Sequence, residues 1–271
     1  MASISLKDRN ILVTGAARGL GRAMTLALIR AGAKVAAVDL DSSKEHFDSL
    51  QTELDQDGIG DRLECMSADL RQARSCDELI QHAIDRCGGL HGLVNNAGIG
   101  MQGFGAVLVG EKPKFYEIAA TDWENVLQTN VNAAFFLSRA ATRVFIKQQY
   151  GKLVNITTSF RTMQQIGFSP YGPSKAALEA ATVIWAKDLA GSGVTANVLL
   201  PGGAANTRMI PQNEITDRTR LVQPEAMGAP IVWLMSSHSD GVSGLRFIAA
   251  EWDQDIPADQ IAASKGSPAG W

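Results

Sequence analysis

The chain has few of the residues that mark several common kinds of protein. Its 271 residues include only three cysteines and four histidines, and neither set has the spacing of a disulfide framework or a zinc site, so we expect no metal. The net charge is -3 and no basic stripe is present, which argues against nucleic-acid binding.

Long hydrophobic runs are lacking as well. No uncharged apolar stretch is long enough to cross a bilayer, and the first residues contain no apolar segment of signal-peptide length. We therefore expect a cytoplasmic protein that does not contact membranes. A hydrophobic content of 45% is ordinary for a globular enzyme, and the length suits one domain spanning residues 1–271.

A glycine-rich turn follows the first short apolar run. Residues 14–21 read Thr-Gly-Ala-Ala-Arg-Gly-Leu-Gly; residues 11–13 before them are apolar, and helical spacing after them lasts until Gly32. A second apolar run, residues 34–38, ends at Asp39. This pattern predicts a βαβ unit with an acidic residue where a ribose diol would lie. The glycines would let the backbone and the helix start approach a pyrophosphate, or would only permit close packing.

Strands and helices continue to alternate along the chain. Further strands are predicted at residues 63–67, 90–95, 152–157, 194–200 and 245–250, and helices near residues 74–87, 122–148, 171–190 and 228–237. The pattern predicts an α/β fold, a single doubly wound Rossmann domain with a seven-stranded parallel sheet flanked by helices. Residues 98–120 are interpreted as an irregular insertion, residues 203–227 as a substrate loop, and residues 253–271 as a tail without clear periodicity.

Tyr171 and Lys175 carry the chemistry that we predict. If Tyr171 begins a helix, Lys175 lies one turn later on nearly the same face. A phenol needs its pKa lowered by roughly 3 units to act as a base near neutrality, and a cation at about 4 Å in an effective dielectric of about 20 supplies the required 4 kcal/mol or so. We expect Tyr171 to move a hydroxyl proton while a bound dinucleotide takes or gives hydride. A surface tyrosine and lysine at helical spacing are the alternative.

Several motifs, in this order, resemble the short-chain dehydrogenase/reductase family, in its single-domain branch, from about Asn10 to about Trp252. They are residues 14–21, Asp69, residues 95–98, Asn130, Tyr171 with Lys175, and Pro201 with Gly202. The resemblance implies a Rossmann fold, a nicotinamide cofactor and the interconversion of an alcohol with a carbonyl. It further implies a homotetramer or homodimer packed through the long helices, to which the small residues Ala176, Ala177, Ala180 and Ala181 are suited.

The same resemblance assigns the site residues. The catalytic positions are Asn130, Thr158, Tyr171 and Lys175, with Asn130 holding a water near the lysine. The cofactor-binding positions are Gly15, Arg18, Gly19, Leu20, Gly21, Asp39, Asp69, Leu70, Asn96, Ala97, Gly98, Tyr171, Lys175, Pro201, Gly202 and Thr207. Among them Asp69 would approach the adenine and Thr207 the carboxamide, although the stretch from Pro201 to Thr207 is one residue longer than the family pattern.

The chain departs from the family pattern at the substrate-orienting hydroxyl. Where the family usually has serine, thirteen positions before the tyrosine, this chain has Thr158, followed by Ser159. Threonine keeps the hydroxyl, but its methyl stiffens χ1 and narrows the pocket. We expect Thr158 to take this role, with Ser159 as the alternative and a purely structural strand residue as a third possibility. The predicted substrate site comprises Thr158, Ser159, Phe160, Tyr171 and Met209. Other residues expected to face the pocket are Met163, Phe168 and Ile210. The apolar residues of this set favour a small to medium, partly hydrophobic or cyclic alcohol or ketone.

Asp39 favours NAD over NADP. Its carboxylate can accept hydrogen bonds from the ribose hydroxyls, whereas a 2′-phosphate would be repelled by up to about 4 kcal/mol. Arg18 argues weakly for NADP, but Leu40 adds no second cation. We predict an NAD-dependent oxidoreductase that interconverts a secondary alcohol and a ketone. The alternatives are an NADP-dependent carbonyl reductase and a non-catalytic dinucleotide-binding sensor.

Overall fold

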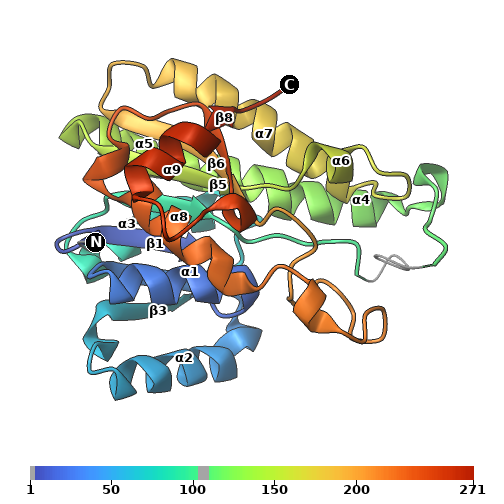
Figure 1. Cartoon of the computed structure of the whole chain (residues 1–271), viewed down its shortest axis with the longest axis horizontal. Coiled ribbons are helices and arrows are strands. Elements are labelled where there is room, and N and C mark those ends of the chain that lie inside the picture. The colour runs from blue at the N-terminus through green and yellow to red at the C-terminus, as the bar shows by residue number, and fades with distance from the viewer. Residues whose placement is uncertain (1–3, 103–109) are drawn as a thin grey trace.

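The computed structural model describes residues 4–102 and 110–271 (Figure 1). Within these residues one sheet has the strand order β3-β2-β1-β4-β5-β6-β7-β8. The strands are β1 (Asn10–Thr14), β2 (Lys34–Asp39), β3 (Leu63–Ser67), β4 (Gly92–Asn95), β5 (Gly151–Ile156), β6 (Val194–Leu200), β7 (Leu245–Ile248) and β8 (Ser267–Pro268). All neighbours pair in parallel except β7 and β8, which are antiparallel.

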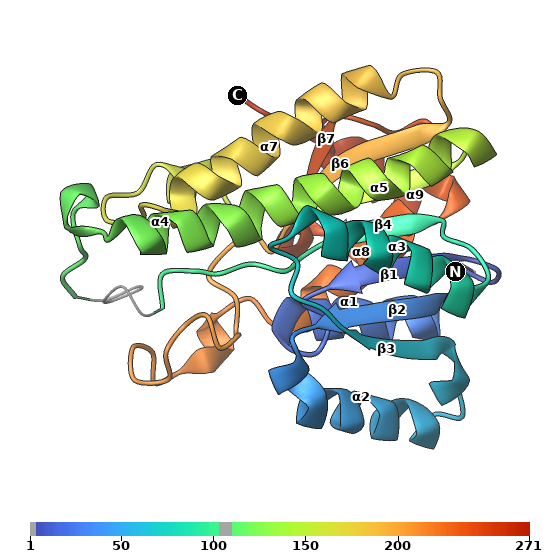
Figure 2. The same ribbon diagram turned by 180° about the vertical axis from the view of Figure 1, so that it is seen from behind.

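Helices cover both faces of the sheet. On the face seen in front in Figure 1 lie α1 (Gly19–Arg30), α2 (Lys44–Gln56), α8 (Gly228–Met235) and α9 (Ala258–Lys265). On the face seen in front in Figure 2 lie α3 (Ala73–Cys87), α4 (Ala120–Leu127), α5 (Ala133–Gln148) and α7 (Tyr171–Asp188). The short helix α6 (Phe160–Met163) directly follows β5. Each face therefore has its own apolar core, and the fold is the predicted α/β Rossmann type.

The register brings the carboxyl ends of the central strands to one edge. Thr14 pairs with Val38, and Val13 with Val94, so β1, β2 and β4 end close together. Every residue of β6 is buried, as expected of a parallel strand covered on both faces. The strand order reverses between β1 and β4, and ligands of open α/β sheets bind at such a point beyond the carboxyl ends.

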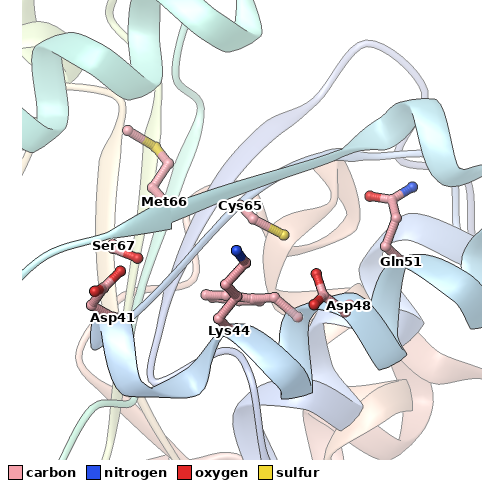
Figure 3. A pocket seen from close by; sticks show the side chains of 8 residues that line it. Asp41, Lys44, Asp48, Gln51, Cys65, Met66 and Ser67 are labelled. Carbon is pink, nitrogen blue, oxygen red and sulfur yellow. The ribbon is translucent and has the colours of Figure 1, made fainter.

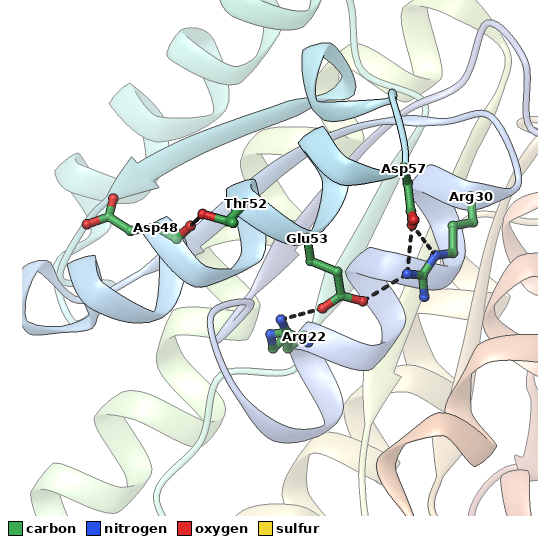
Figure 4. A network of polar contacts seen from close by, with 6 residues as sticks. All are labelled: Arg22, Arg30, Asp48, Thr52, Glu53 and Asp57. Atoms are coloured by element: carbon green, nitrogen blue, oxygen red, sulfur yellow. Dashed lines mark hydrogen bonds and ion pairs between the residues drawn. The ribbon is translucent and has the colours of Figure 1, made fainter.

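Two surface helices, α1 and α2, are joined by a network of charged groups (Figure 4). Glu53 binds Arg22 at 2.6 Å and Arg30 at 2.8 Å, and Arg30 also binds Asp57 at 2.8 Å. Because these side chains are between about a quarter and a half exposed, each pair adds little to the free energy of unfolding. Their effect is to fix the orientation of α2 along α1.

The C-terminal region differs from the prediction. Residues 253–271 show no clear periodicity in the sequence, but they contain α9 and the additional edge strand β8. The sheet is therefore not the predicted all-parallel sheet of seven strands. A two-residue strand has no period that a sequence can display, and α9 spans only eight residues.

The structure also differs from the prediction in the middle of the chain and in the number of helices. The helix expected over residues 122–148 is two α-helices joined by a π-helical segment, Gln128–Asn132. Helix α2 was not predicted. Part of the expected insertion, residues 103–109, lies outside the described residues. The described rest of the insertion contains one 3₁₀ turn, and residues 203–227 contain two. Over the described parts of the chain, no helix has both the length and the apolar character that spanning a bilayer requires.

Candidate active site

The turn between β1 and α1 fits only glycine at two positions. Gly15 has φ +62, a conformation that side chains disfavour. A Cβ on Gly21 would lie 2.0 Å from the carbonyl oxygen of Gly15 and 2.6 Å from Nδ2 of Asn96. The first turn of α1 consequently packs directly on the end of β1, and the turn presents backbone rather than side chains.

The start of α1 is suited to an anion. Its N-cap is Arg18, and among the described residues no side chain caps the first turn and no acidic residue lies within it. The first N–H groups of a helix lack intrahelical partners and carry partial positive charge. A Cβ on Gly19 would lie 2.9 Å from the methyl of Thr207. The structure therefore brings Thr207 together with the predicted positions at Gly15, Arg18, Gly19, Leu20 and Gly21.

Thr14 joins the glycine turn to the segment after β4. Its hydroxyl oxygen accepts the N–H groups of Asn96 and Ala97, both at 3.0 Å. The Asn96 amide donates to the carbonyls of Thr14 at 2.8 Å and Gly15 at 3.0 Å. Asn96 and Ala97, both predicted cofactor positions, are thus fixed against the turn. Thr14 was not singled out from the sequence, because a threonine at the end of a strand is also a common structural residue.

Asp39 lies beside the same turn at the end of β2. One carboxylate oxygen accepts the Ala17 N–H at 3.1 Å, and the other accepts the Leu40 N–H at 2.8 Å and the Ser43 hydroxyl at 2.9 Å. A carboxylate has about four acceptor positions, so one is left for a ligand. These hydrogen bonds hold the Asp39 carboxylate in place at the end of β2.

The remaining cofactor positions surround this edge. Asp69 follows β3 and binds Arg71 at 2.5 Å, and this hydrogen bond lowers the pKa of the Asp69 carboxyl. Leu70 beside it is buried. Gly202, with φ +99, follows β6, where Pro201 accepts a backbone hydrogen bond from Ala250 at 3.0 Å. All of these residues lie beyond carboxyl ends of strands, as the sequence predicted.

The face of α7 that meets β5 carries Tyr171 and Lys175. The Lys175 ammonium donates to the carbonyl of Ile156 at 2.8 Å and lies 5.9 Å from the centre of the Tyr171 ring. The Thr158 side chain lies close enough to the Tyr171 hydroxyl to affect the pKa of the phenol. Pro173 is tolerated in the first turn of α7, since its missing N–H would have no helical partner there.

Burial dominates the electrostatics of this pair. It raises the pKa of Tyr171 to about 12, against the opposing effect of the Thr158 side chain. It lowers the pKa of Lys175 to about 8. The direction for Tyr171 is opposite to the prediction, because the cost of removing the phenolate from water outweighs the groups that favour it. In the protein alone the phenol is protonated at neutral pH.

Thr158 and Ser159 have different surroundings. The Thr158 side chain meets Tyr171, whereas the Ser159 hydroxyl caps α6 by accepting the Thr162 N–H at 3.1 Å. Phe160 lies farther along, with its ring 4.0 Å from the Arg246 guanidinium carbon. The structure thus places Thr158, and not Ser159 or Phe160, against the tyrosine.

Apolar side chains lie on the other side of Tyr171. Met101 and Phe168 are buried and pack with the Tyr171 ring. Met209 lies over the backbone of Gly100, where an added Cβ would be 2.5 Å from its Cγ. Phe168, Met209 and Tyr171 of this group were predicted to face the substrate pocket, and Met101 was not. Met101 carries no local signal that separates a pocket wall from a core position.

Asn130 lies in the π-helical segment between α4 and α5. Its side-chain oxygen accepts the Ile99 N–H at 2.7 Å, and its amide donates to the Ile99 carbonyl at 2.9 Å and the Ser174 hydroxyl at 3.0 Å. A Cβ on Gly98 would lie 3.2 Å from Asn130 and 3.4 Å from the Lys175 ammonium. Asn130 therefore joins α7 to the loop after β4, and Gly98 of that loop lies beside both Asn130 and the Lys175 ammonium. π-Helical segments often occur at functional sites.

A hollow of ≈ 460 Å³ lies away from these residues, between α2 and β3 (Figure 3). Its polar lining includes Lys44, Asp48 and Cys65. Burial and the neighbouring Asp48 raise the pKa of the Cys65 thiol to about 11, so it is protonated at neutral pH and a poor nucleophile. None of the predicted site residues lines this hollow. In the described chain, no three His, Cys, Asp or Glu side chains gather closely enough to hold a metal ion.

Comparisons with known proteins agree with this geometry. The short chain dehydrogenase family model matches residues 9–217. The chain is 29% identical to the 2-dehydro-3-deoxy-D-gluconate 5-dehydrogenase of Escherichia coli K12, over 90% of this chain and 94% of that protein. It is 30% identical to the 3-oxoacyl-[acyl-carrier-protein] reductase FabG of Thermotoga maritima, over 88% and 95%. A Beutenbergia cavernae structure with NADP at low occupancy superimposes with a TM-score of 0.78 at 27% identity, over 92% and 97%.

Proposed function

The chain belongs to the short-chain dehydrogenase family, and we propose that it interconverts a secondary alcohol and a ketone with Tyr171 as the general acid and base. It is an NAD(P)-dependent oxidoreductase, like the relatives that it matches. The observation that carries the proposal is the contact between the Tyr171 phenol and the Thr158 hydroxyl, one helical turn from Lys175. A purely dinucleotide-binding sensor would not need this arrangement.

The residues at the β1–α1 turn fit a dinucleotide. A Cβ would fill the space at Gly15 and Gly21, and the uncapped start of α1 offers N–H groups to a pyrophosphate. Gly15, Gly19 and Gly21 would admit the phosphates, and Asp39 would accept from the ribose. Bound there, the nicotinamide coenzyme would supply the hydride acceptor or donor.

We favour NAD over NADP because of Asp39. Its carboxylate is held by three hydrogen bonds from the protein and would repel a 2′-phosphate. The Beutenbergia cavernae relative binds NADP, so the two coenzymes are the direct comparison. The catalytic efficiency with NAD should exceed that with NADP at least tenfold or so. Comparable efficiencies would refute the role given to Asp39.

The proton path runs through protein groups. In the direction of reduction, the protonated Tyr171 phenol would donate to the carbonyl oxygen, and the Thr158 hydroxyl would orient that oxygen. Lys175 would stabilise the resulting phenolate from one helical turn away. Asn130 would hold the loop after β4 and a water near Lys175 in place.

The apolar surroundings favour a substrate with a hydrophobic side. Met101, Phe168 and Met209 lie near Tyr171 or over the loop after β4. The names of the two relatives indicate different substrates, a deoxygluconate for one and an acyl chain for the other. We propose a partly hydrophobic or cyclic secondary alcohol, or its ketone, for this chain.

Absorbance of the reduced coenzyme provides the test. The protein is incubated with NAD and, separately, with hexonates, 3-hydroxyacyl thioesters and cyclic secondary alcohols. We expect turnover with at least one alcohol and the highest catalytic efficiency with an apolar or cyclic compound. Tight NAD binding without turnover of any of these alcohols would favour the sensor instead.

We further propose a cytoplasmic homotetramer or homodimer packed through α5 and α7. Phe135 and Ile184 are 45% and 57% exposed on these helices, and Ala177 beside Ile184 is also exposed, so together they form a surface suited to helix contact. Light scattering would detect the assembly, and a monomer at micromolar concentration would contradict it.

A further inference from the structure

A buried ion pair lies directly behind the contact between Tyr171 and Thr158. The side chains of Glu179 and Arg246 are 0% and 5% exposed, and Nη1 of Arg246 donates to Oε1 of Glu179 at 2.9 Å. Removing two charges from water costs several kcal/mol per ion, which their attraction often only offsets. The pair is therefore weakly explained by stability, and its other contacts become informative.

Those contacts hold the end of β5. Oε2 of Glu179 accepts the Thr157 hydroxyl at 2.8 Å, and Nη2 of Arg246 donates to the Thr158 carbonyl at 3.0 Å. The guanidinium also lies over the Phe160 ring, with 4.0 Å from its carbon to the ring centre. Side chains from α7 and β7 thus hold the Thr157 side chain before the Thr158 Cα and the Thr158 carbonyl after it.

Helix α7 extends the same arrangement toward the reacting groups. Tyr171, Lys175 and Glu179 recur at intervals of four residues and so line one helix face. Lys175 holds the Ile156 carbonyl at 2.8 Å, one residue before the Thr157 hydroxyl that Glu179 holds. Helix α7 thus holds two successive residues at the end of β5, and Arg246 of β7 holds the Thr158 carbonyl that follows them.

The C-terminal residues cover the ion pair. Strand β8 pairs with β7 at Arg246, and the Gly270 N–H donates to Oε1 of Glu179 at 3.4 Å. The Trp271 ring lies 6.0 Å from the Phe160 ring, centre to centre. This cover keeps water from the pair and strengthens its electrostatic contacts.

We propose that Arg246 is a positioning residue that orients the Thr158 hydroxyl toward Tyr171, with Glu179 fixing the guanidinium. The inference rests on the proposed function, because it assigns Arg246 a role in that proton transfer. Without the Nη2 donor, the Thr158 peptide can rotate, and a displacement of about 1 Å at a reacting group can lower turnover about a hundredfold.

The test compares two variants that each remove one ion pair from an end of β5. In Arg246→Met with Glu179→Leu, both charges behind the site are replaced by apolar side chains, which often leaves stability unchanged or higher. In the control, Lys152→Met with Asp240→Asn, the buried Lys152 at the start of β5 and its 2.6 Å partner Asp240 are replaced by uncharged side chains. Arg246→Lys tests rescue, since lysine keeps a donor and a charge.

We expect the first double variant to fold and to bind NAD with a Kd within about twofold of wild type, while kcat falls about tenfold or more. The control should keep kcat, and Arg246→Lys should recover part of it. A folded double variant with wild-type kcat, or an equal loss in the control, would overturn the inference. Should the double variant not fold, Arg246→Gln, which keeps a donor but no charge, is compared with Arg246→Met. We expect a higher kcat in Arg246→Gln, and equal kcat values in the two variants would overturn the inference.

Tyr171→Phe is measured beside these variants to separate the two proposals. If it is inactive and the charge-free double variant is fully active, the positioning role alone is wrong. If Tyr171→Phe keeps full turnover, the proposed function fails and the inference fails with it.

Discussion

At the scale of single residues, the burial of Lys175 is the most consequential feature. Its side chain is 4% exposed, and burial lowers its pKa from 10.5 to about 8. Such a shift corresponds to about 3 kcal/mol of unfolding free energy forgone at neutral pH. A lysine kept at that cost, next to a phenol, is better explained by chemistry than by stability.

The Lys175 shift predicts how stability depends on pH. The pKa of Lys175 is lower in the folded state than in the unfolded state. Below about pH 8 Lys175 is protonated in both states, and the folded state bears the full cost of the buried charge. Between about pH 8 and 10.5 only the unfolded state binds the proton, so the free energy of unfolding rises with pH. The unfolding free energy of the wild type, relative to Lys175→Met, should therefore increase by about 2–3 kcal/mol from pH 7 to pH 10. Urea unfolding at both pH values measures this. A constant difference would mean that the pKa is not depressed.

A second prediction distinguishes the roles of the adjacent Thr158 and Ser159 hydroxyls. Thr158→Ala removes the partner of the Tyr171 phenol and should lower kcat about a hundredfold with little change in coenzyme affinity. Ser159→Ala removes the cap of α6 and should cost about 1 kcal/mol of stability but little turnover. Steady-state kinetics and thermal unfolding of both variants distinguish these roles. A large loss of kcat in Ser159→Ala alone would refute the assignment to Thr158.

At the scale of elements, our proposal makes coenzyme binding depend on the fit between β1 and α1. Gly21→Ala would put a Cβ 2.0 Å from the Gly15 carbonyl oxygen, so α1 must move and unfolding free energy should fall by about 2–3 kcal/mol. Coenzyme affinity should fall with it. Fluorescence titration of NADH measures the affinity.

Gly88→Ala is the matched control for Gly21→Ala. Gly88 ends α3 with φ +80, and an added Cβ would meet nothing within 4 Å among the described residues. It should cost about 1 kcal/mol through backbone strain alone and leave NADH affinity unchanged. Unchanged affinity in Gly21→Ala would contradict the role of this turn.

At the scale of the whole molecule, the βαβ pattern and the order of the motifs predicted the family and the fold. Asp39 and Tyr171 were predicted as site residues because each follows a strand or begins a helix that has its own local pattern, and Asn96 because residues 95–98 resemble the family motif. Strand β8 and the pairing of Glu179 with Arg246 were not identified, because they depend on contacts between α7, β7 and the C-terminal residues. Glu179 does stand one turn after Lys175, which is a signal that could have been used; Arg246, inside a short strand, has none.

The electrostatic prediction for Tyr171 required the structure as well. Spacing in the sequence places Lys175 near the phenol, but it does not show how strongly both groups are desolvated or that the Ile156 carbonyl engages the ammonium. The prediction of one domain over residues 1–271 stays a prediction.

The most direct measurement of the central claim is the turnover of Tyr171→Phe with NAD and an alcohol that the wild type oxidises. The substitution removes only the phenolic hydroxyl, so NADH affinity and the melting temperature should change little, while kcat should fall by about 10²–10⁴. Turnover equal to that of the wild type, in a variant that binds NADH normally, would contradict Tyr171 as the group that transfers the proton.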